Sequence, residues 1–266
     1  MKLIPEWKDH QSCLLAWPCN IDLYGSQMNK AKIEIANLAN QISEEEKVYI
    51  YCNEIDYQEC QSIVANKDIS IMKSNLDDSW MRDIAPIFYQ DKNILKSVSF
   101  NFNGYGKYPD FENDNKISDF ISSQFEIPCS KSNITLEGGA ITYDDNGNLF
   151  TTESVLLNPN RKNQSKEIIE KELIELFDLN KIIWIPNGLE EDDTDGHIDN
   201  IFCPIGNNRY LIASNNSINT KNFKILEQSK AILKKELNMQ DPSNEIIDIP
   251  LPSETYINNK KLVASY

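Results

Sequence analysis

The sequence predicts an α+β protein in which a strand–strand–helix–strand unit recurs about four times along one chain. Hairpin signals alternate with stretches of helical apolar spacing, and this order returns at a regular interval. In addition, unusual polar residues follow the third strand of each unit. Units repeated in this way are usually stacked or arranged around an axis, and a circular arrangement would bring those polar loops to one face.

The clearest unit contains two strands, a helix and a short third strand, which we place at 85–89, 94–101, 115–125 and 134–136. A polar turn at Asp91-Lys92 separates the first two strands, so they form a predicted hairpin. Within the helix, Ile117, Ile121 and Phe125 lie on one face. The third strand leads directly into Glu137-Gly138-Gly139.

Two further units follow the same order. In the first, Asn146-Gly147 is a strong hairpin signal between strands. The predicted elements of these units are strands at 140–143 and 149–157, a helix at 165–178 and a strand at 181–185, then a hairpin within 198–213, a helix at 222–237 and a strand at 246–249. A weaker unit precedes them all, with strands at 13–17, 47–52 and 69–72 and helices at 30–42 and 58–65.

The last residues, Lys261 to Tyr266, begin another strand, and no partner follows it. An apolar strand without a partner is an exposed edge. We therefore expect one domain over 1–266 that ends before a final unit.

Composition indicates a globular protein of the cytoplasm. Of the 266 residues, 40% are hydrophobic and 25% are charged, which is typical of a soluble domain with a sizeable core. The apolar runs are far too short to cross a membrane, and the N-terminus does not resemble a signal peptide. The 6 cysteines form no CxxC pair, so we expect free thiols in a reducing compartment.

The net charge of the sequence indicates which kinds of partner it could bind. The net charge of −15 argues against nucleic acid, because phosphate binding needs a basic face. An acidic mouth would instead steer a cationic substrate inward. Solubility is the simpler explanation of the same charge.

His197 is the most informative candidate residue, because it stands among carboxylates in Thr194-Asp195-Gly196-His197-Ile198-Asp199. Nearby anions favour the charged imidazole, which suits a proton carrier. The alternatives are a surface histidine in an acidic loop, or a metal site made with Asp195 and Asp199.

Asp83, Trp80 and Glu137 are further candidates. A planar cation such as guanidinium binds a carboxylate bidentately and stacks on an aromatic ring, contacts that Asp83 and Trp80 could supply. An Asp–Arg pair beside a core tryptophan would explain the same residues. Glu137 precedes two glycines, which allow close approach of the backbone to a ligand or form an ordinary turn.

Several segments stand in the order found in agmatine deiminases of the bacterial peptidyl-arginine deiminase-like family, and the resemblance extends from the first residues to Tyr266. The segments are Pro5-Glu6-Trp7, Leu15-Ala16-Trp17-Pro18, Ser79-Trp80-Met81-Arg82-Asp83, Asn101-Phe102-Asn103, Leu136-Glu137-Gly138-Gly139, Thr151-Thr152-Glu153, Leu157-Asn158-Pro159-Asn160-Arg161 and Asp192-Asp193-Thr194-Asp195-Gly196-His197-Ile198-Asp199.

The resemblance implies an α/β propeller, the pentein fan of ββαβ modules around a pseudo-fivefold axis, with the last module largely missing from this sequence. It implies that Asp83 and Asp199 hold a guanidinium group and that His197 is the general acid and base. Glu137 would orient the histidine. Substrate-pocket residues are implied at Trp80, Asp193 and Asp195. No metal or organic cofactor is implied, the expected partner is a small cationic guanidine substrate, and a homo-oligomer stays open.

The implied reaction converts agmatine and water to N-carbamoylputrescine and ammonia, a step of putrescine biosynthesis. A cysteine thiolate attacks the guanidine carbon, ammonia leaves, and water releases the ureido product. This sequence ends before the Gly-Gly-Gly-Asn-x-His-Cys motif that carries the family nucleophile. Its own cysteines stand in other contexts, at Cys13, Cys19, Cys52, Cys60, Cys129 and Cys203. In addition, Tyr105 stands where the family often has tryptophan, which alters the pocket wall.

Three alternatives stay open. One is a deiminase of arginine in peptides. Another is a protein that binds guanidinium compounds or a partner without turnover. The third is a metal-dependent hydrolase that uses Asp195, His197 and Asp199.

Overall fold

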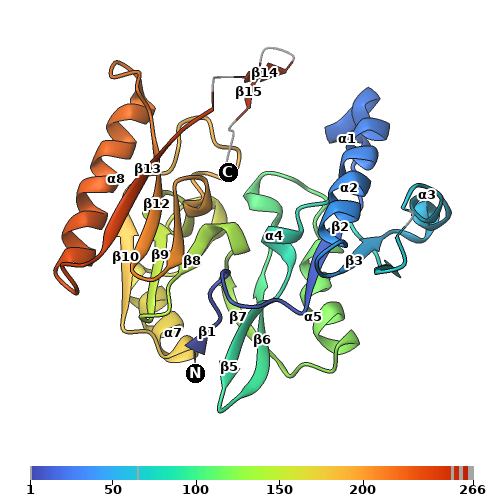
Figure 1. The fold of residues 1–266 in the computed structure, drawn as a ribbon, viewed down its shortest axis with the longest axis horizontal. Helices are drawn as coiled ribbons and strands as arrows, with labels where there is room; N and C mark the ends of the chain where they lie inside the picture. The colour runs from blue at the N-terminus through green and yellow to red at the C-terminus, as the bar shows by residue number, and fades with distance from the viewer. Residues whose placement is uncertain (1, 65, 253–254, 258–259, 263–266) are drawn as a thin grey trace.

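The computed structural model describes all residues except 1, 65, 253–254, 258–259 and 263–266. Its strands form several small sheets, and helices α2, α5, α7 and α8 lie on the outside of them (Figure 1). The N-terminal units, in blue and green, lie on one side of the molecule, and the C-terminal units, in yellow and red, lie on the other. The predicted mixed fold of repeated modules is confirmed.

The second unit has the predicted strand–strand–helix–strand order. Strands β5 (Ile87–Asp91) and β6 (Ile94–Asn101) form an antiparallel hairpin. Helix α5 (Asp114–Gln124) then crosses over, and β7 (Cys129–Thr135) pairs parallel with β6. At the outer edge, β1 (Lys2–Leu3) pairs antiparallel with β5.

The third and fourth units repeat this topology, with an antiparallel hairpin and a parallel third strand in each. Their elements are β8 (Ile141–Tyr143), β9 (Asn148–Thr152), α7 (Lys166–Phe177) and β10 (Lys181–Ile185), then β11 (Phe202–Gly206), β12 (Arg209–Ser214), α8 (Lys221–Asn238) and β13 (Glu245–Pro250). Each crossover helix buries one face. On α7 this face consists of Ile169, Leu173 and Phe177, all less than 2% exposed.

Hairpin turns follow the local chemistry of the sequence. Lys92 and Asn93 have φ of 49° and 65°, and Asn207 and Asn208 have φ of 53° and 58°. Positive φ at both central residues is the conformation that matches the twist of a two-residue hairpin. These turns fix the register of the strands that lead toward the polar loops.

The first unit differs from the others because all its strands are parallel. It contains β2 (Ser12–Ala16), α2 (Met28–Ile42), β3 (Lys47–Cys52), α3 (Tyr57–Ile63) and β4 (Ile69–Lys73), with the short helix α1 (Ile21–Tyr24) before α2. A helix separates each pair of neighbouring strands, and such a crossover returns the chain in the same direction.

Two strand boundaries differ most from the prediction. Strand β7 begins at Cys129, well before the predicted start at residue 134, because its first residues are polar and show no apolar pattern. Strand β9 ends at Thr152, whereas the prediction extended to 157. Residues Glu153–Leu156 form helix α6 instead, because the Thr152 hydroxyl accepts a hydrogen bond from the Val155 amide and caps it.

The chain end contains a small hairpin. Strand β14 (Thr255–Ile257) pairs antiparallel with β15 (Lys260–Leu262). The strand predicted from residue 261 therefore has a partner that precedes it, too short to show a pattern in the sequence. The remainder of that prediction, residues 263–266, lies outside the described residues. Throughout the described part of the chain, every helix is too short or too polar to traverse a lipid bilayer.

Candidate active site

The candidate residues come from loops that leave the third strands of neighbouring units. Strand β4 leads to the short helix α4 (Met81–Ile84), which lies near the middle of the molecule in Figure 1. Helix α4 carries Asp83. Strand β7 leads to Glu137 and a 3-10 turn at Gly138–Ala140. Strand β10 leads to the loop that carries His197 and Asp199.

His197 lies between two carboxylates. Its Nδ1 atom is 3.6 Å from Oδ1 of Asp83, and its Nε2 atom is 3.5 Å from Oε2 of Glu137. All three side chains are less than 10% exposed. Neither His197 Nε2 nor Glu137 Oε2 has a closer hydrogen-bond partner among the described residues. The imidazole therefore interacts with the two carboxylates through their charges, at distances longer than those of good hydrogen bonds.

Gly139 reveals how tightly the loops converge. A Cβ atom built on Gly139 would lie 2.5 Å from His197 Nδ1, 2.6 Å from Asp199 Oδ2 and 2.7 Å from Asp83 Oδ1. Residues far apart in sequence therefore meet at one point, and only glycine leaves that point open. The Gly139 amide also donates a hydrogen bond to Asp83 Oδ1, at 3.0 Å.

The charged groups of this centre change one another's pKa values. Burial alone would lower the pKa of His197, but Asp83 and Glu137 outweigh burial and raise it to about 9. Burial alone would raise the pKa of Glu137, but its interactions with His197 and Arg161 lower it. Burial raises the pKa of Asp199 to about 6, against the opposing charge of His197. A pKa of about 9 leaves the His197 imidazole protonated at neutral pH.

Arg161 is the site residue that sequence reasoning missed. Its side chain is fully buried, and its Nε donates to Glu137 Oε1 at 2.7 Å. The two terminal nitrogens donate to the Tyr105 carbonyl at 2.7 Å and to the Thr194 carbonyl at 2.9 Å. Arg161 thus joins loops of the second and third units behind Glu137. Its segment was among those quoted for the family, but no pattern distinguished this arginine from a surface residue.

Asp195 lies apart from the histidine centre. One of its oxygens is 2.7 Å from Lys107 Nζ, and the other is 2.8 Å from Arg161 NH1 and accepts a hydrogen bond from Asn160. Both oxygens therefore hold the loop in place. The hypothetical metal set of Asp195, His197 and Asp199 does not share a centre, and no metal-binding group of three or more such side chains occurs within the described residues.

Asp199 forms an ion pair with the guanidinium group of Arg82. Arg82 Nε is 3.5 Å from Asp199 Oδ2, and Arg82 NH1 is 2.5 Å from Oε1 of Glu6. This pairing partly neutralises Asp199 and ties the N-terminal segment to the centre. The Asp–Arg pair that was weighed for Asp83 therefore exists, but its carboxylate is Asp199.

The remaining pocket candidates are more exposed. Trp80 is 47% exposed, and its indole nitrogen donates to Asp78 at 3.1 Å. Asp193 is exposed, and its carbonyl accepts a hydrogen bond from Lys107. Both residues lie outside the contacts that surround His197, in places open to a ligand.

The cysteines are all free thiols. Burial raises the pKa of Cys203, on the strand after the His197 loop. A hydrogen bond from Cys60 lowers the pKa of Cys52, but both belong to the buried core of the first unit. The charges of Glu6, Arg82 and Asp199 also act on the Cys203 thiol.

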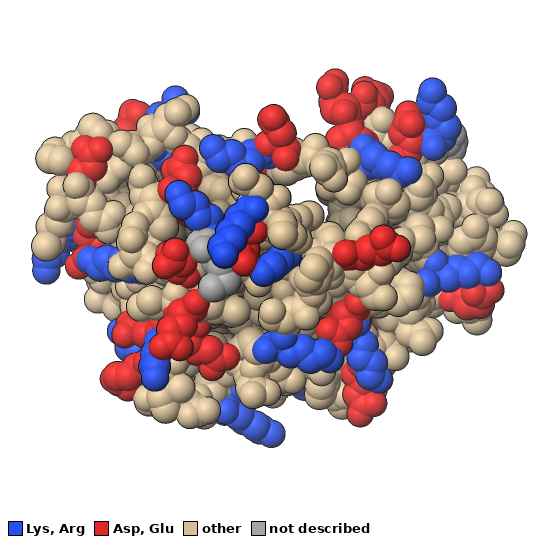
Figure 2. Space-filling model, turned by 90° about the horizontal axis from the view of Figure 1, so that it is seen from below, with Lys and Arg blue, Asp and Glu red and all other residues tan. Residues whose placement is uncertain are grey.

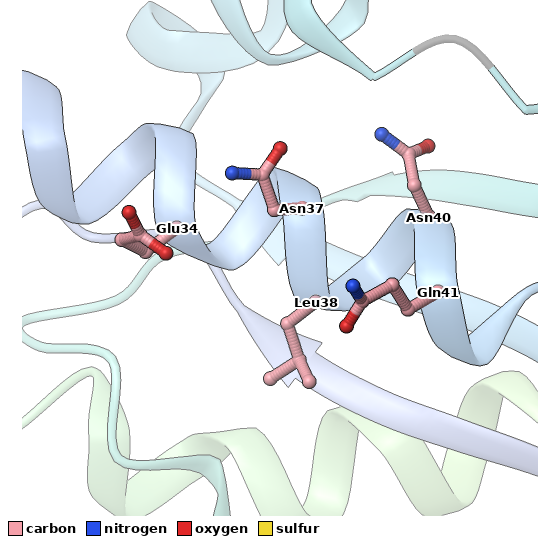
Figure 3. Close-up of a pocket in the computed structure, with 5 residues that line it drawn as sticks. All are labelled: Glu34, Asn37, Leu38, Asn40 and Gln41. Carbon is pink, nitrogen blue, oxygen red and sulfur yellow. The ribbon is translucent and has the colours of Figure 1, made fainter.

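Outside the site, one face and one hollow of the described surface bear on where the function lies. On the face shown in Figure 2, acidic and basic side chains are interspersed. A hollow of about 450 Å³ lies on α2, lined by Glu34, Asn37, Leu38, Asn40 and Gln41 (Figure 3). It contains a single carboxylate and no residue of the His197 centre, so we place the function at the buried centre.

Comparison with known proteins identifies the class. Residues 2–266 match the Porphyromonas-type peptidyl-arginine deiminase family. The agmatine deiminase of Stutzerimonas stutzeri (strain A1501) is 29% identical over 262 residues, which cover 96% of this chain and 71% of that protein. A serine-for-cysteine variant of the C. jejuni agmatine deiminase with substrate bound has a TM-score of 0.87 and 28% identity, and the match covers 100% of this chain and 78% of that one.

A third similar structure, the agmatine deiminase of Enterococcus faecalis, has a TM-score of 0.90. At 21% identity over 98% of this chain and 74% of that one, it supports the fold alone. The fan of modules is therefore a pentein fold, of the class of hydrolases that act on C–N bonds of linear amidines. The chain belongs to the Porphyromonas-type peptidyl-arginine deiminase family.

Proposed function

We propose that this site binds the guanidinium group of agmatine between Asp83 and Asp199, with His197 as the proton carrier. The observation that carries the proposal is the convergence of both carboxylates and the imidazole around Gly139. Two carboxylates that grip a guanidinium localise its charge and fix the line of attack on its carbon. The S. stutzeri and C. jejuni relatives are both named as agmatine deiminases.

The proposed reaction is hydrolysis of agmatine to N-carbamoylputrescine and ammonia, within putrescine biosynthesis. The protonated His197 would donate to the departing nitrogen, and the neutral imidazole would then activate water. Glu137, fixed by Arg161, would hold the ring in place. Covalent catalysis also needs a thiolate, and these 266 residues contain no Gly-Gly-Gly-Asn-x-His-Cys segment. For the residues named we therefore propose guanidinium binding, with His197 placed to transfer protons once a thiolate attacks the guanidine carbon.

Burial favours a small substrate over a peptide. Asp83 is 9% exposed and His197 is 2% exposed, which suits a free guanidine on a flexible tail better than an arginine in a folded chain. The free thiols of the sequence support a cytoplasmic location.

Calorimetry with agmatine tests the proposal. We expect saturable binding to the wild-type chain, and at least about tenfold weaker binding to the Asp83→Asn variant, since a buried charged hydrogen bond is lost. The matched control is Asp119→Asn, which changes an exposed carboxylate of α5 that pairs with Lys131. Equal affinity for agmatine and butane-1,4-diamine, which lacks the guanidinium, would contradict the proposal.

An assay of ammonia release from agmatine distinguishes substrate binding from turnover. Binding without release is expected if none of the six cysteines acts as nucleophile. Ammonia release that is abolished by Cys203→Ala would show instead that Cys203 is the nucleophile. Stronger binding of acetyl-arginine amide than of agmatine would favour the peptidyl-arginine alternative.

A further inference from the structure

We infer that Tyr105 is a positioning residue, whose hydroxyl fixes the Asp83 carboxylate in the orientation that faces His197 and a bound guanidinium. The inference rests on the proposed function, because that function assigns guanidinium binding to Asp83. It gives the tyrosine a role beyond the pocket wall expected from the sequence.

The hydrogen bonds of Asp83 carry the inference. The Tyr105 hydroxyl donates to Asp83 Oδ2 at 2.7 Å, and the Gly139 amide donates to Asp83 Oδ1 at 3.0 Å. The terminal torsion of an aspartate is broad, so its two oxygens exchange readily unless donors hold them. With one donor on each oxygen, Oδ1 stays on the side of His197.

The placement of Tyr105 is itself strongly determined. The residue has φ of 57°, an unfavourable conformation for a bulky side chain, and it is 7% exposed. Its carbonyl accepts the hydrogen bond from Arg161, and its ring packs edge-on against Phe102, with centroids 5.2 Å apart. The ring also lies 6.1 Å from that of His197. A strained residue held this firmly directs its hydroxyl to one target.

The hydroxyl keeps its proton. Burial, followed by the charge of Asp83, raises the pKa of Tyr105 well above its usual range. The hydroxyl therefore acts as a donor to the carboxylate at every pH at which the protein would be assayed. A carboxylate oxygen has acceptor capacity for more than one donor, so Oδ2 can still accept from a guanidinium.

Tyr108 offers a matched control from the same loop. Its ring lies 6.1 Å from that of Tyr105, but it is 44% exposed, and it has no hydrogen bond to Asp83 among the described contacts. Removing its hydroxyl therefore removes a tyrosine oxygen nearby without touching the carboxylate.

Calorimetric titration with agmatine and with butane-1,4-diamine, which lacks the guanidinium, tests the inference. Tyr105→Phe should weaken agmatine binding about tenfold and leave butane-1,4-diamine binding within about threefold of the wild type, because only the guanidinium needs the orientation of the Asp83 carboxylate. Tyr108→Phe should stay within about threefold of the wild type for both compounds. Wild-type agmatine affinity in Tyr105→Phe, or an equal loss for both compounds, would overturn the inference.

A double-mutant cycle in urea keeps this test independent of agmatine. Tyr105→Phe, Asp83→Asn and the double variant should show at least about threefold coupling in the unfolding equilibrium constant. If the wild type fails to bind agmatine, the proposed function fails, and the cycle still decides whether the hydroxyl supports Asp83. Additive effects would show that it does not.

Discussion

At the residue scale, the site depends on Gly139, which has no side chain. Three polar atoms from two loops lie within 2.7 Å of the point where a Cβ of Gly139 would be. Its neighbour Gly138 is similarly constrained, since its Cβ would lie 2.0 Å from the Arg82 carbonyl. Glycine at these positions permits the close approach of α4 to the turn after β7.

Gly139→Ala should therefore damage both agmatine binding and folding. The added methyl must displace His197 or a carboxylate, so we expect at least tenfold weaker agmatine binding and a loss of about 1–3 kcal/mol in unfolding free energy. Calorimetry and urea unfolding measure the two effects. Gly25→Ala is the control: its Cβ would have no neighbour within 4 Å, but its φ of 47° strains an alanine. It should therefore lower stability and leave agmatine affinity unchanged. Normal agmatine affinity in Gly139→Ala would show that the convergence is not the binding point.

At the scale of elements, the N-terminus of α5 anchors the loop that carries Trp80 and Asp83. Asp114 accepts hydrogen bonds from the amides of Asp77 and Asp78, at 2.9 and 3.1 Å. In return, Asp77 accepts from the amide of Asn113 at 2.7 Å. This reciprocal pairing joins the first and second units just before α4.

Asp114→Ala should loosen that loop. Two amides lose their acceptor, so we expect a loss of about 2 kcal/mol in stability and weaker agmatine binding. Hydrogen exchange should accelerate at the Asp77 and Asp78 amides. Asp119→Ala on the same helix removes only an exposed ion pair, and it should cost less than about 0.5 kcal/mol. Unchanged exchange at the two amides in Asp114→Ala would contradict this role of α5.

At the scale of the whole molecule, the fan encloses a charged centre, and this links stability to pH. The folded state raises the pKa of His197 to about 9, whereas an unfolded histidine titrates near about 6.5. The resulting stability is fully present below about pH 6.5 and is lost as the pH rises toward 9.

Urea unfolding should therefore show a decline in stability of about 3 kcal/mol between pH 6.5 and 9. The His197→Gln variant should lack most of this decline, because it cannot carry the proton. His10→Gln is the control, since His10 is an exposed histidine. A decline of equal size in His197→Gln would assign the effect to other groups.

The secondary structure predicted from the sequence was right where interactions between neighbouring residues decide the conformation. Lys92, Asn93, Asn207 and Asn208 form the expected hairpin turns, because backbone preference and strand twist act within a few residues. It failed at Thr152, where a side-chain cap ended the strand. It also missed Arg161, because a lone arginine in a loop gives no sign that three loops will close around it.

The sequence by itself determined the repeated module, the family resemblance and the polar loops after the third strands, because apolar periodicity and turn residues act locally. Only the tertiary structure decided which loop residues face one another. Asp83, Glu137 and Asp199 surround His197, whereas Asp195 turns to Arg161 and Lys107. Nearness in sequence could not distinguish Asp195 from Asp199, since side-chain direction in a loop depends on the charges that the other units place around it.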